Sequence, residues 1–282
     1  MDLKQAIHFA QLVNAAYAVT PGNLTNAAGK SLTIGGTTYT VVTTIYCNDL
    51  ATDINPLRGD SIVSIGLVLQ AAGTGDVVLA IRGTEGIMEW VQDGRFCQVT
   101  CPLAAGAGNS EDGFTAMYST FRIGSDPKTS PGLVSSLATL AFPQPVTAAT
   151  SVTICGHSLG GALATLLALD IAANTIFKNP TAYTYASPRT GDGSFTVFYN
   201  HMVPNTFRVA NRMDLVPKLP MPPLYEHVST PFELNPVQMT SLPPKVLVKP
   251  TLACEHILDT YLYLLSLAAG GAVIPLDAQC AA

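Results

Sequence analysis

Ser158 stands at the centre of the pentapeptide Gly156-His157-Ser158-Leu159-Gly160, a pattern that can support nucleophilic catalysis. An apolar run, residues 152–155, precedes the serine, and an alanine- and leucine-rich run begins at Gly160. A serine in a sharp turn between a buried strand and a helix needs glycines two positions away, because side chains there would keep the two elements apart. The pattern predicts that Ser158 is a nucleophile and that the backbone N–H of Leu159, at the helix N-terminus, stabilises an oxyanion.

A serine hydroxyl becomes a good nucleophile when an imidazole accepts its proton and a carboxylate orients that imidazole. In hydrolases with this turn, the acid and then the histidine follow the serine along the chain. Asp214 comes in a loop directly after the strand-like residues 206–209, so it is the predicted acid. Both His227 and His256 lie beyond it. We favour His256 as the base, because it follows a loop whereas residues 224–228 are strand-like, and loops more often position catalytic groups.

The other histidines fit the role of base less well. His8 precedes the serine, and His157 is adjacent to it on a sharp turn, so the His157 side chain must point elsewhere and is interpreted as structural. His201 would need an acid between the serine and itself, such as Asp170 or Asp192. Asp170 lies too far along the helix that follows the serine to reach the same edge of a sheet.

A second oxyanion donor is predicted at Thr84, in the sequence Arg82-Gly83-Thr84 that follows the apolar run 77–81. The next segment, residues 85–94, has the pattern of a short amphipathic helix between Gly86 and Gly94. Such a helix is more often an ordinary core-facing one, but its place beside the oxyanion loop favours a mobile lid over the site. The apolar residues that we expect to contact substrate from this lid are Ile87, Met88, Trp90 and Val91.

The elements that must position these residues alternate between strands and helices. Helices are predicted at 3–17, 114–122, 133–140, 160–175, 196–201 and from about 255, and strands at 38–46, 61–69, 76–81, 152–155, 183–185 and 206–209. The alternation predicts an α/β fold with a mostly parallel central sheet and helices on both faces, with catalytic groups at the carboxyl ends of the strands. Because no repeat or linker divides the sequence, a single domain over residues 1–282 is expected.

Composition excludes several other functions. Hydrophobic residues make up 48% of the chain and charged residues 12%, with a net charge of -5, so a nucleic-acid partner is not expected. The longest apolar stretch, residues 261–276, is shorter than the roughly 20 residues of a membrane span and is interpreted as a core helix and its exit. The N-terminal sequence lacks the features of a secretory signal, so the protein is expected to be cytoplasmic, or secreted with the signal removed.

The sequence contains six cysteines. Only Cys97 and Cys101 are close together, and one such pair is poor evidence for zinc, so a local disulfide or two free thiols is favoured. Cys155 lies in a predicted strand and is interpreted as a buried core thiol. No metal or cofactor is expected.

Together these motifs resemble the fungal-type triacylglycerol lipase family, the class 3 lipases, which also include feruloyl esterases. The resemblance runs from Phe9 to His256. It rests on Arg82-Gly83-Thr84, Asp112-Gly113-Phe114, the pentapeptide around Ser158 with Gly161, Ala186-Ser187-Pro188-Arg189 and Asp214-Leu215-Val216-Pro217. The resemblance implies an α/β-hydrolase fold, a triad of Ser158, Asp214 and His256, oxyanion donors at Thr84 and Leu159, and a lid that opens at a lipid–water interface.

The sequence therefore predicts a carboxylic ester hydrolase, with a triacylglycerol lipase favoured. A feruloyl or other soluble-ester esterase is the main alternative within the enzyme class. A catalytically inactive binding module on the same scaffold is a remote alternative, because every catalytic part is present. The expected partners are a lipid or ester substrate and, transiently, the lipid–water interface.

Overall fold

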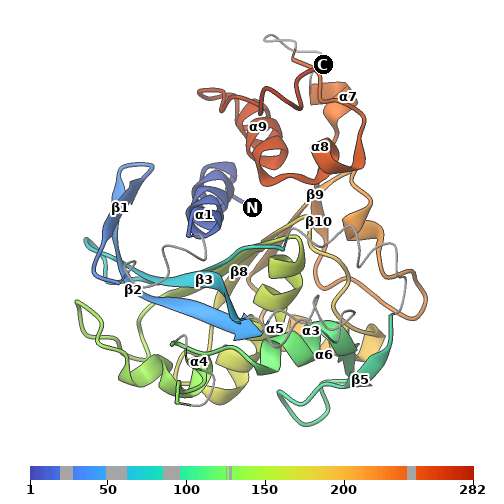
Figure 1. The fold of residues 1–282 in the computed structure, drawn as a ribbon. Coiled ribbons are helices and arrows are strands. Elements are labelled where there is room, and N and C mark those ends of the chain that lie inside the picture. The colour runs from blue at the N-terminus through green and yellow to red at the C-terminus, as the bar shows by residue number, and fades with distance from the viewer. Residues whose placement is uncertain (20–27, 49–61, 85–95, 125, 127–128, 240–245) are drawn as a thin grey trace.

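The computed structural model describes residues 1–19, 28–48, 62–84, 96–124, 126, 129–239 and 246–282. Within them, an eight-stranded sheet has the order β1-β2-β3-β4-β7-β8-β9-β10 (Figure 1). Its strands are β1 (Ser31–Ile34), β2 (Thr37–Asn48), β3 (Ile62–Ala71), β4 (Val77–Ile81), β7 (Val152–His157), β8 (Thr181–Tyr185), β9 (Thr206–Asn211) and β10 (Pro231–Leu234). Strands β1 to β4 pair antiparallel and strands β4 to β10 pair parallel, so the predicted mostly parallel sheet is present with an antiparallel edge.

Helices cover both faces of the sheet. One face carries α1 (Leu3–Tyr17), α8 (Leu252–His256) and α9 (Leu258–Ala269), with α7 (Pro236–Met239) beside them. The other face carries α3 (Asp112–Ser119), α4 (Leu133–Ser136), α5 (Leu159–Asn174) and α6 (Gly193–Met202). Helices α1 and α9 come from opposite ends of the chain and lie side by side (Figure 1). A two-stranded sheet of β5 (Gln98–Thr100) and β6 (Asn109–Glu111) precedes α3.

Strand β4 contributes side chains to two hydrophobic cores, one on each face of the sheet. All five of its residues are buried, which explains why it reads as a continuous apolar run. Successive side chains of a strand point to opposite faces. Val77, Leu79 and Ile81 accordingly belong to the core under α3, α4 and α5, whereas Val78 and Ala80 belong to the core under α1 and α9. Burial on both faces holds the central strands, and therefore their carboxyl ends, in fixed positions.

Two predictions about secondary structure were wrong. Residues 224–228 do not form a strand; only an isolated bridge joins Glu226 to Gly191, and the strand at this edge of the sheet, beyond β9, is β10. The C-terminal helix does not begin near residue 255, because His256 ends α8 and a separate helix begins at Leu258. No helix in the described residues is long and apolar enough to cross a membrane.

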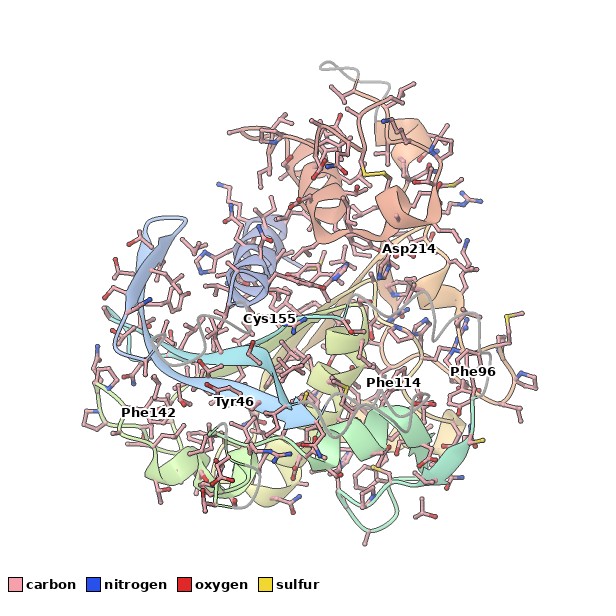
Figure 2. All side chains as sticks on the ribbon, in the orientation of Figure 1. Tyr46, Phe96, Phe114, Phe142, Cys155 and Asp214 are labelled. Carbon is pink, nitrogen blue, oxygen red and sulfur yellow. A yellow bond between two sulfur atoms is a disulfide. The ribbon has the colours of Figure 1, made fainter. Side chains whose placement is uncertain are left out.

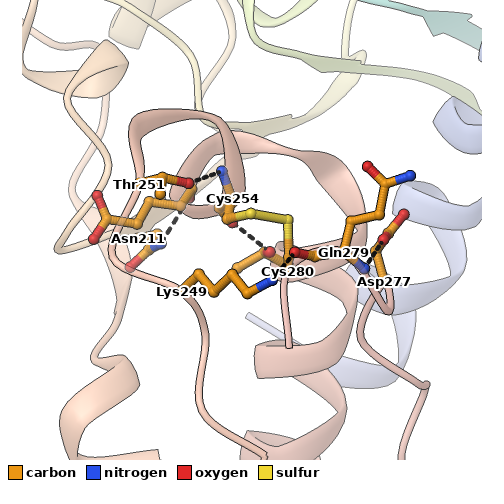
Figure 3. The surroundings of a disulfide bond; sticks show 9 residues. Asn211, Lys249, Thr251, Cys254, Asp277, Gln279 and Cys280 are labelled. Carbon is orange, nitrogen blue, oxygen red and sulfur yellow. Dashed lines mark hydrogen bonds between the residues drawn. A yellow bond between two sulfur atoms is a disulfide. The ribbon is translucent and has the colours of Figure 1, made fainter. Parts of the chain in front are cut away.

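One disulfide, between Cys254 and Cys280, joins α8 to the C-terminal residues (Figure 3). The sequence did not predict it, because the two residues are 26 positions apart and nothing in their spacing marks a pair. Cys97 and Cys101 form no disulfide, so the free-thiol interpretation of this pair holds. Cys155 is fully buried in the core, as predicted (Figure 2).

Candidate active site

Ser158 lies in a strained turn between the last residue of β7 and the first residue of α5. Its φ of 60° and ψ of -130° are unusual for a residue with a side chain. The chain can turn this sharply because of Gly156 and Gly160: a Cβ on Gly156 would lie 2.1 Å from the carbonyl oxygen of Gly160, and one on Gly160 would lie 2.4 Å from that of Arg82. The glycines of the pentapeptide therefore have the steric role that the sequence predicts.

The structure brings Ser158, His256 and Asp214 into one chain of hydrogen bonds. The Oγ of Ser158 is 2.8 Å from Nε2 of His256, and Nδ1 of His256 is 2.8 Å from Oδ2 of Asp214. A carboxylate can only accept, so Nδ1 of His256 carries a proton and Nε2 is free to accept the proton of the serine hydroxyl. The exposed fractions of these side chains are 1%, 6% and 1%, and Asp214 lies at the end of the sheet next to α8 (Figure 2).

Further hydrogen bonds hold Asp214 in place. The hydroxyl of Tyr261 donates to Oδ2 over 2.7 Å, and the backbone N–H of Val216 donates to Oδ1 over 3.0 Å. Burial raises the pKa of the Tyr261 hydroxyl well above its usual value, so this group stays a donor. The sequence does not single out Tyr261, because it lies in the apolar run 261–276 that predicts a core helix; the available signal is a tyrosine within such a run.

Asn211 connects the end of β9 to α8. Its backbone N–H donates to the hydroxyl of Tyr261 over 3.0 Å, and its side-chain amide donates to the carbonyl of Glu255 over 2.8 Å. Figure 3 shows this second bond beside the Cys254–Cys280 disulfide. Asp214, through Tyr261, and the short helix that ends at His256 are thus joined to the same strand end.

The alternative acid and bases lie elsewhere. The Nε2 of His227 is 2.6 Å from the carbonyl oxygen of Pro217, so this nitrogen donates to backbone. Burial, followed by the positive charge of Arg208, lowers the pKa of His227 to about 3, which keeps its ring neutral. Asp170, on α5, accepts a hydrogen bond from the hydroxyl of Tyr118 on α3. His201 lies on the exposed surface near the end of α6.

A cavity of about 460 Å³ opens beside the serine. It is lined by Asn14, Tyr17, Thr84, His157, Ser158, Ala253, His256, Ile257, Leu258 and Asp259. The predicted oxyanion residue Thr84 thus faces the same space as Ser158, and the other one, Leu159, is the first residue of α5. Asp259 also lines the cavity, but the carboxylate bonded to the His256 ring is that of Asp214.

The predicted lid, residues 85–94, with Ile87, Met88, Trp90 and Val91, lies outside the residues that the structure describes. Among the described residues, no group of three or more histidine, cysteine, aspartate or glutamate side chains could hold a metal ion. The described residues thus place a buried carboxyl group, an imidazole and a hydroxyl beside a partly apolar cavity. Such an arrangement can support acyl transfer through a covalent intermediate.

Comparison with known proteins places this geometry in a family. The profile of "Lipase (class 3)" matches residues 78–223, more than half of the 282 residues. The chain belongs to the class 3 lipase family. The matched segment contains Thr84, Ser158 and Asp214, and the resemblance seen in the sequence is confirmed.

Relatives of this class 3 lipase come from plants and fungi. Phospholipase A1-II 7 of Oryza sativa subsp. indica is 31% identical over 215 residues, which cover 68% of this chain and 52% of the relative. The secreted mono- and diacylglycerol lipase 1 of Fusarium solani is 27% identical over 241 residues, covering 83% of this chain and 64% of the relative. The chain spans about half the length of the plant phospholipases A1 that it matches.

Solved structures agree with the fold. The mono- and diacylglycerol lipase of Aspergillus oryzae matches with a TM-score of 0.60 at 23% identity, covering 83% of this chain and 80% of that one. A structure described under the words "an unusual buried polar cluster in a family of fungal lipases" matches with a TM-score of 0.62 at 25% identity, covering 82% and 79%. The predicted α/β-hydrolase fold is therefore confirmed.

Proposed function

We propose that this class 3 lipase hydrolyses carboxylic esters of lipids, with Ser158, His256 and Asp214 as its catalytic triad. The single observation that carries the proposal is the hydrogen-bonded chain from the Ser158 hydroxyl through His256 to Asp214, at the edge of a cavity. Membership of the family and the names of its relatives support an ester of glycerol as substrate.

In the first half of the reaction, the Oγ of Ser158 bonds to the ester carbonyl carbon while its proton passes to Nε2 of His256. The carbonyl oxygen becomes an oxyanion, for which we propose the backbone N–H groups of Thr84 and Leu159 as donors. The tetrahedral intermediate then collapses, the C–O bond to the alcohol breaks, and His256 gives its proton to the leaving alkoxide. Asp214 holds the ring in the required tautomer and stabilises the imidazolium that forms.

In the second half, His256 takes a proton from water, and the resulting hydroxide attacks the acyl-enzyme. The proton returns to Oγ of Ser158 as the fatty acid leaves.

Within this proposal, a lipid substrate at a lipid–water interface is favoured over a soluble ester. The apolar part of the cavity wall, Ala253, Ile257 and Leu258, suits an acyl chain or the apolar part of a glyceride. The test compares initial rates on emulsified triacylglycerol, diacylglycerol and monoacylglycerol with rates on a soluble short-chain ester, below and above its solubility limit. A lipase gains activity on emulsions, whereas a rate that depends only on dissolved ester identifies the esterase alternative.

We further propose that residues 85–94 form a lid over the site, as the sequence predicts. Its test is Trp90→Ala, which should reduce hydrolysis of emulsified substrate more than hydrolysis of dissolved ester. An equal loss on both substrates would remove the lid from this account and leave the chemistry of Ser158 unaffected.

We also propose that the protein is secreted. Fungal relatives carry the word "secreted" in their names, and structural disulfides such as Cys254–Cys280 form in oxidising compartments. Titration of thiols in the denatured, unreduced protein should find four free thiols among the six cysteines. Six free thiols in protein isolated from its natural source would contradict secretion.

A further inference from the structure

Tyr17, the last residue of α1, has its hydroxyl between the oxyanion loop and the residue that precedes the serine. The backbone N–H of Gly83 donates to this hydroxyl over 2.8 Å. The same hydroxyl is 2.8 Å from Nδ1 of His157. On the far side of the His157 ring, Nε2 is 2.8 Å from the backbone carbonyl oxygen of His256. A continuous path of hydrogen bonds thus runs from Gly83 to His256 without passing through Ser158.

The direction of each bond in this path follows from chemistry. A carbonyl oxygen can only accept, so Nε2 of His157 carries the proton and donates to His256. In the neutral ring Nδ1 must then accept, which makes the Tyr17 hydroxyl its donor. The lone pairs of that hydroxyl accept the N–H of Gly83. Every donor and acceptor in the path has a single compatible role, so the path allows one arrangement of the three groups.

Neither side chain in the path changes its charge near neutral pH. Burial lowers the pKa of His157 well below its usual value, and the charge of His256 lowers it further. Burial raises the pKa of Tyr17 to about 12. The path therefore holds the same geometry over the range in which an ester hydrolase with a histidine base works.

Gly83 is held from both sides. Its N–H is bonded to Tyr17, and its carbonyl oxygen accepts a hydrogen bond from Nη1 of Arg82 over 2.8 Å. That carbonyl belongs to the same peptide plane as the N–H of Thr84, and the two groups of a peptide plane point in opposite directions. The hydrogen bonds to the N–H and to the carbonyl oxygen of Gly83 therefore fix the direction of the Thr84 N–H, which we have proposed as an oxyanion donor.

The packing leaves little room for this loop to move toward the serine. A Cβ on Gly83 would lie 2.6 Å from the Tyr17 hydroxyl and 3.0 Å from both the His157 carbonyl oxygen and Cβ of Ser158. The loop can move only away from the turn that holds Ser158, and the hydrogen bond from the Gly83 N–H to the Tyr17 hydroxyl opposes that movement.

We propose that Tyr17 and His157 are positioning residues that keep the Thr84 N–H and the backbone of His256 in register with Ser158. The inference rests on the ester-hydrolase function proposed above. Loss of the path leaves all catalytic groups present but displaces the oxyanion donor, and displacements of about 1 Å can cost on the order of 10²-fold in rate. The loss should appear in kcat, because the oxyanion forms only in the tetrahedral intermediate and the transition states that flank it and not in bound substrate.

The first test is Tyr17→Phe, assayed with soluble p-nitrophenyl esters. We expect kcat to fall by about 10- to 100-fold while KM changes less than about twofold. Because Tyr17 also lines the cavity, the assay uses acetate, butyrate and octanoate esters: a positioning role gives the same fold-loss for all three, whereas lost contact with substrate gives a loss that depends on acyl length. The acid limb of the pH–rate profile should not move, since the base and its acid are untouched.

Tyr183→Phe is the matched control. The Tyr183 hydroxyl also bonds to α1, donating to Oε1 of Gln5 over 3.0 Å, but it has no connection to Gly83 or His157. It should lose a similar small amount of stability, measured by thermal unfolding, with kcat unchanged. If Tyr17→Phe and Tyr183→Phe lose stability alike and both keep full kcat, the Tyr17 hydroxyl is only structural and the inference is overturned.

The second test separates the two arms of His157. The side-chain amide of glutamine reaches as far as Nε2 of histidine and can donate to the His256 carbonyl, whereas that of asparagine reaches only as far as Nδ1 and can accept from Tyr17. His157→Gln should therefore reproduce the kcat loss of Tyr17→Phe, and the double variant Tyr17→Phe/His157→Gln should lose no more than the larger single loss. Losses that multiply in the double variant would show two independent effects and overturn the single path.

His157→Asn keeps the Tyr17 arm and loses the His256 arm. We expect its kcat loss to be smaller than that of His157→Gln, with Thr84 still held, because α8 is also held through Asn211. The opposite order would contradict the inference. A wild-type protein without esterase activity would instead refute the proposed function, so the two failures are distinguishable.

Discussion

His256 and His227 both follow Asp214 along the chain, and both donate a hydrogen bond, yet they lie in regions of opposite charge. Around His256 the facing groups are the carboxylate of Asp214 and the hydroxyl of Ser158. Around His227 they are a backbone carbonyl and the guanidinium groups of Arg208 and Arg189, whose charges lower the pKa of His227 further after burial. An imidazolium is stabilised in the first region and opposed in the second, so only the first can serve a base that becomes charged during the reaction.

The largest effect that this comparison predicts is the difference between His256→Ala and His227→Ala. The first variant removes the proposed base, and hydrolysis of a soluble p-nitrophenyl ester should fall by at least about 10³-fold, with losses near 10⁶-fold known for triads. The second should keep its rate and lose about 1–3 kcal/mol of unfolding free energy, because a partly buried hydrogen bond is lost. Normal activity in His256→Ala, or inactivity in a folded His227→Ala protein, would reverse the comparison.

Asp214→Asn tests the negative charge on its own. The amide has the same shape but can favour the wrong imidazole tautomer, so kcat should fall by roughly 10⁴-fold while the melting temperature changes little. The matched control is Asp259→Asn, since Asp259 lines the same cavity without a bond to the His256 ring. A larger rate loss in Asp259→Asn than in Asp214→Asn would show that Asp214 is not the acid of the triad.

Tyr261→Phe removes the hydroxyl that donates to Asp214. A hydrogen bond to a charged group contributes about 1.5–3 kcal/mol, so we expect kcat to fall on the order of 10-fold together with a loss of stability. Tyr263→Phe is a suitable control on the same helix, because that hydroxyl donates to the carbonyl of Val246, away from the acid. Equal kinetic losses in the two variants would show that Tyr261 acts only through the stability of α9.

A further prediction, on stability and not on rate, concerns the pH dependence of unfolding at His227. Its pKa is lowered from 6.5 to about 3 in the folded chain, so between these values the unfolded chain binds a proton that the folded chain does not. Unfolding free energy must therefore fall as pH drops, by roughly 2 kcal/mol between pH 7 and pH 5 from this one group. In His227→Gln, whose amide can still donate to Pro217, that part of the fall should vanish. Denaturant titrations at pH 7 and pH 5 measure the fall in unfolding free energy for each protein. An equal fall in the wild-type protein and in His227→Gln would contradict the lowered pKa of His227.

The nucleophile could be read from the sequence because its requirements are local. A glycine two positions to either side, an apolar strand before and a helix after are all contained in residues 152–175, and β7 and α5 form at those places. Long elements with strong periodicity, such as α1, were also predicted at their observed bounds. The prediction of a mostly parallel sheet needed only the alternation of these elements.

What the sequence could not supply depends on contacts between distant segments. The four residues of β1 and of β10 are too short to show a period, and they become strands only because β2 and β9 offer them partners. The Cys254–Cys280 pair and the bond from Tyr261 to Asp214 are equally non-local. His157 was placed correctly away from the serine, but its partners, Tyr17 and the carbonyl of His256, are 140 and 99 positions away.

The most direct test of the central claim is covalent labelling of the serine by a fluorophosphonate. Wild-type protein should incorporate one equivalent, with ester hydrolysis lost in proportion, and peptide mapping should locate the label on Ser158. Ser158→Ala should remain folded, take up no label and lose hydrolysis by at least about 10³-fold. Label on another residue, or hydrolysis that survives in folded Ser158→Ala, would contradict the account.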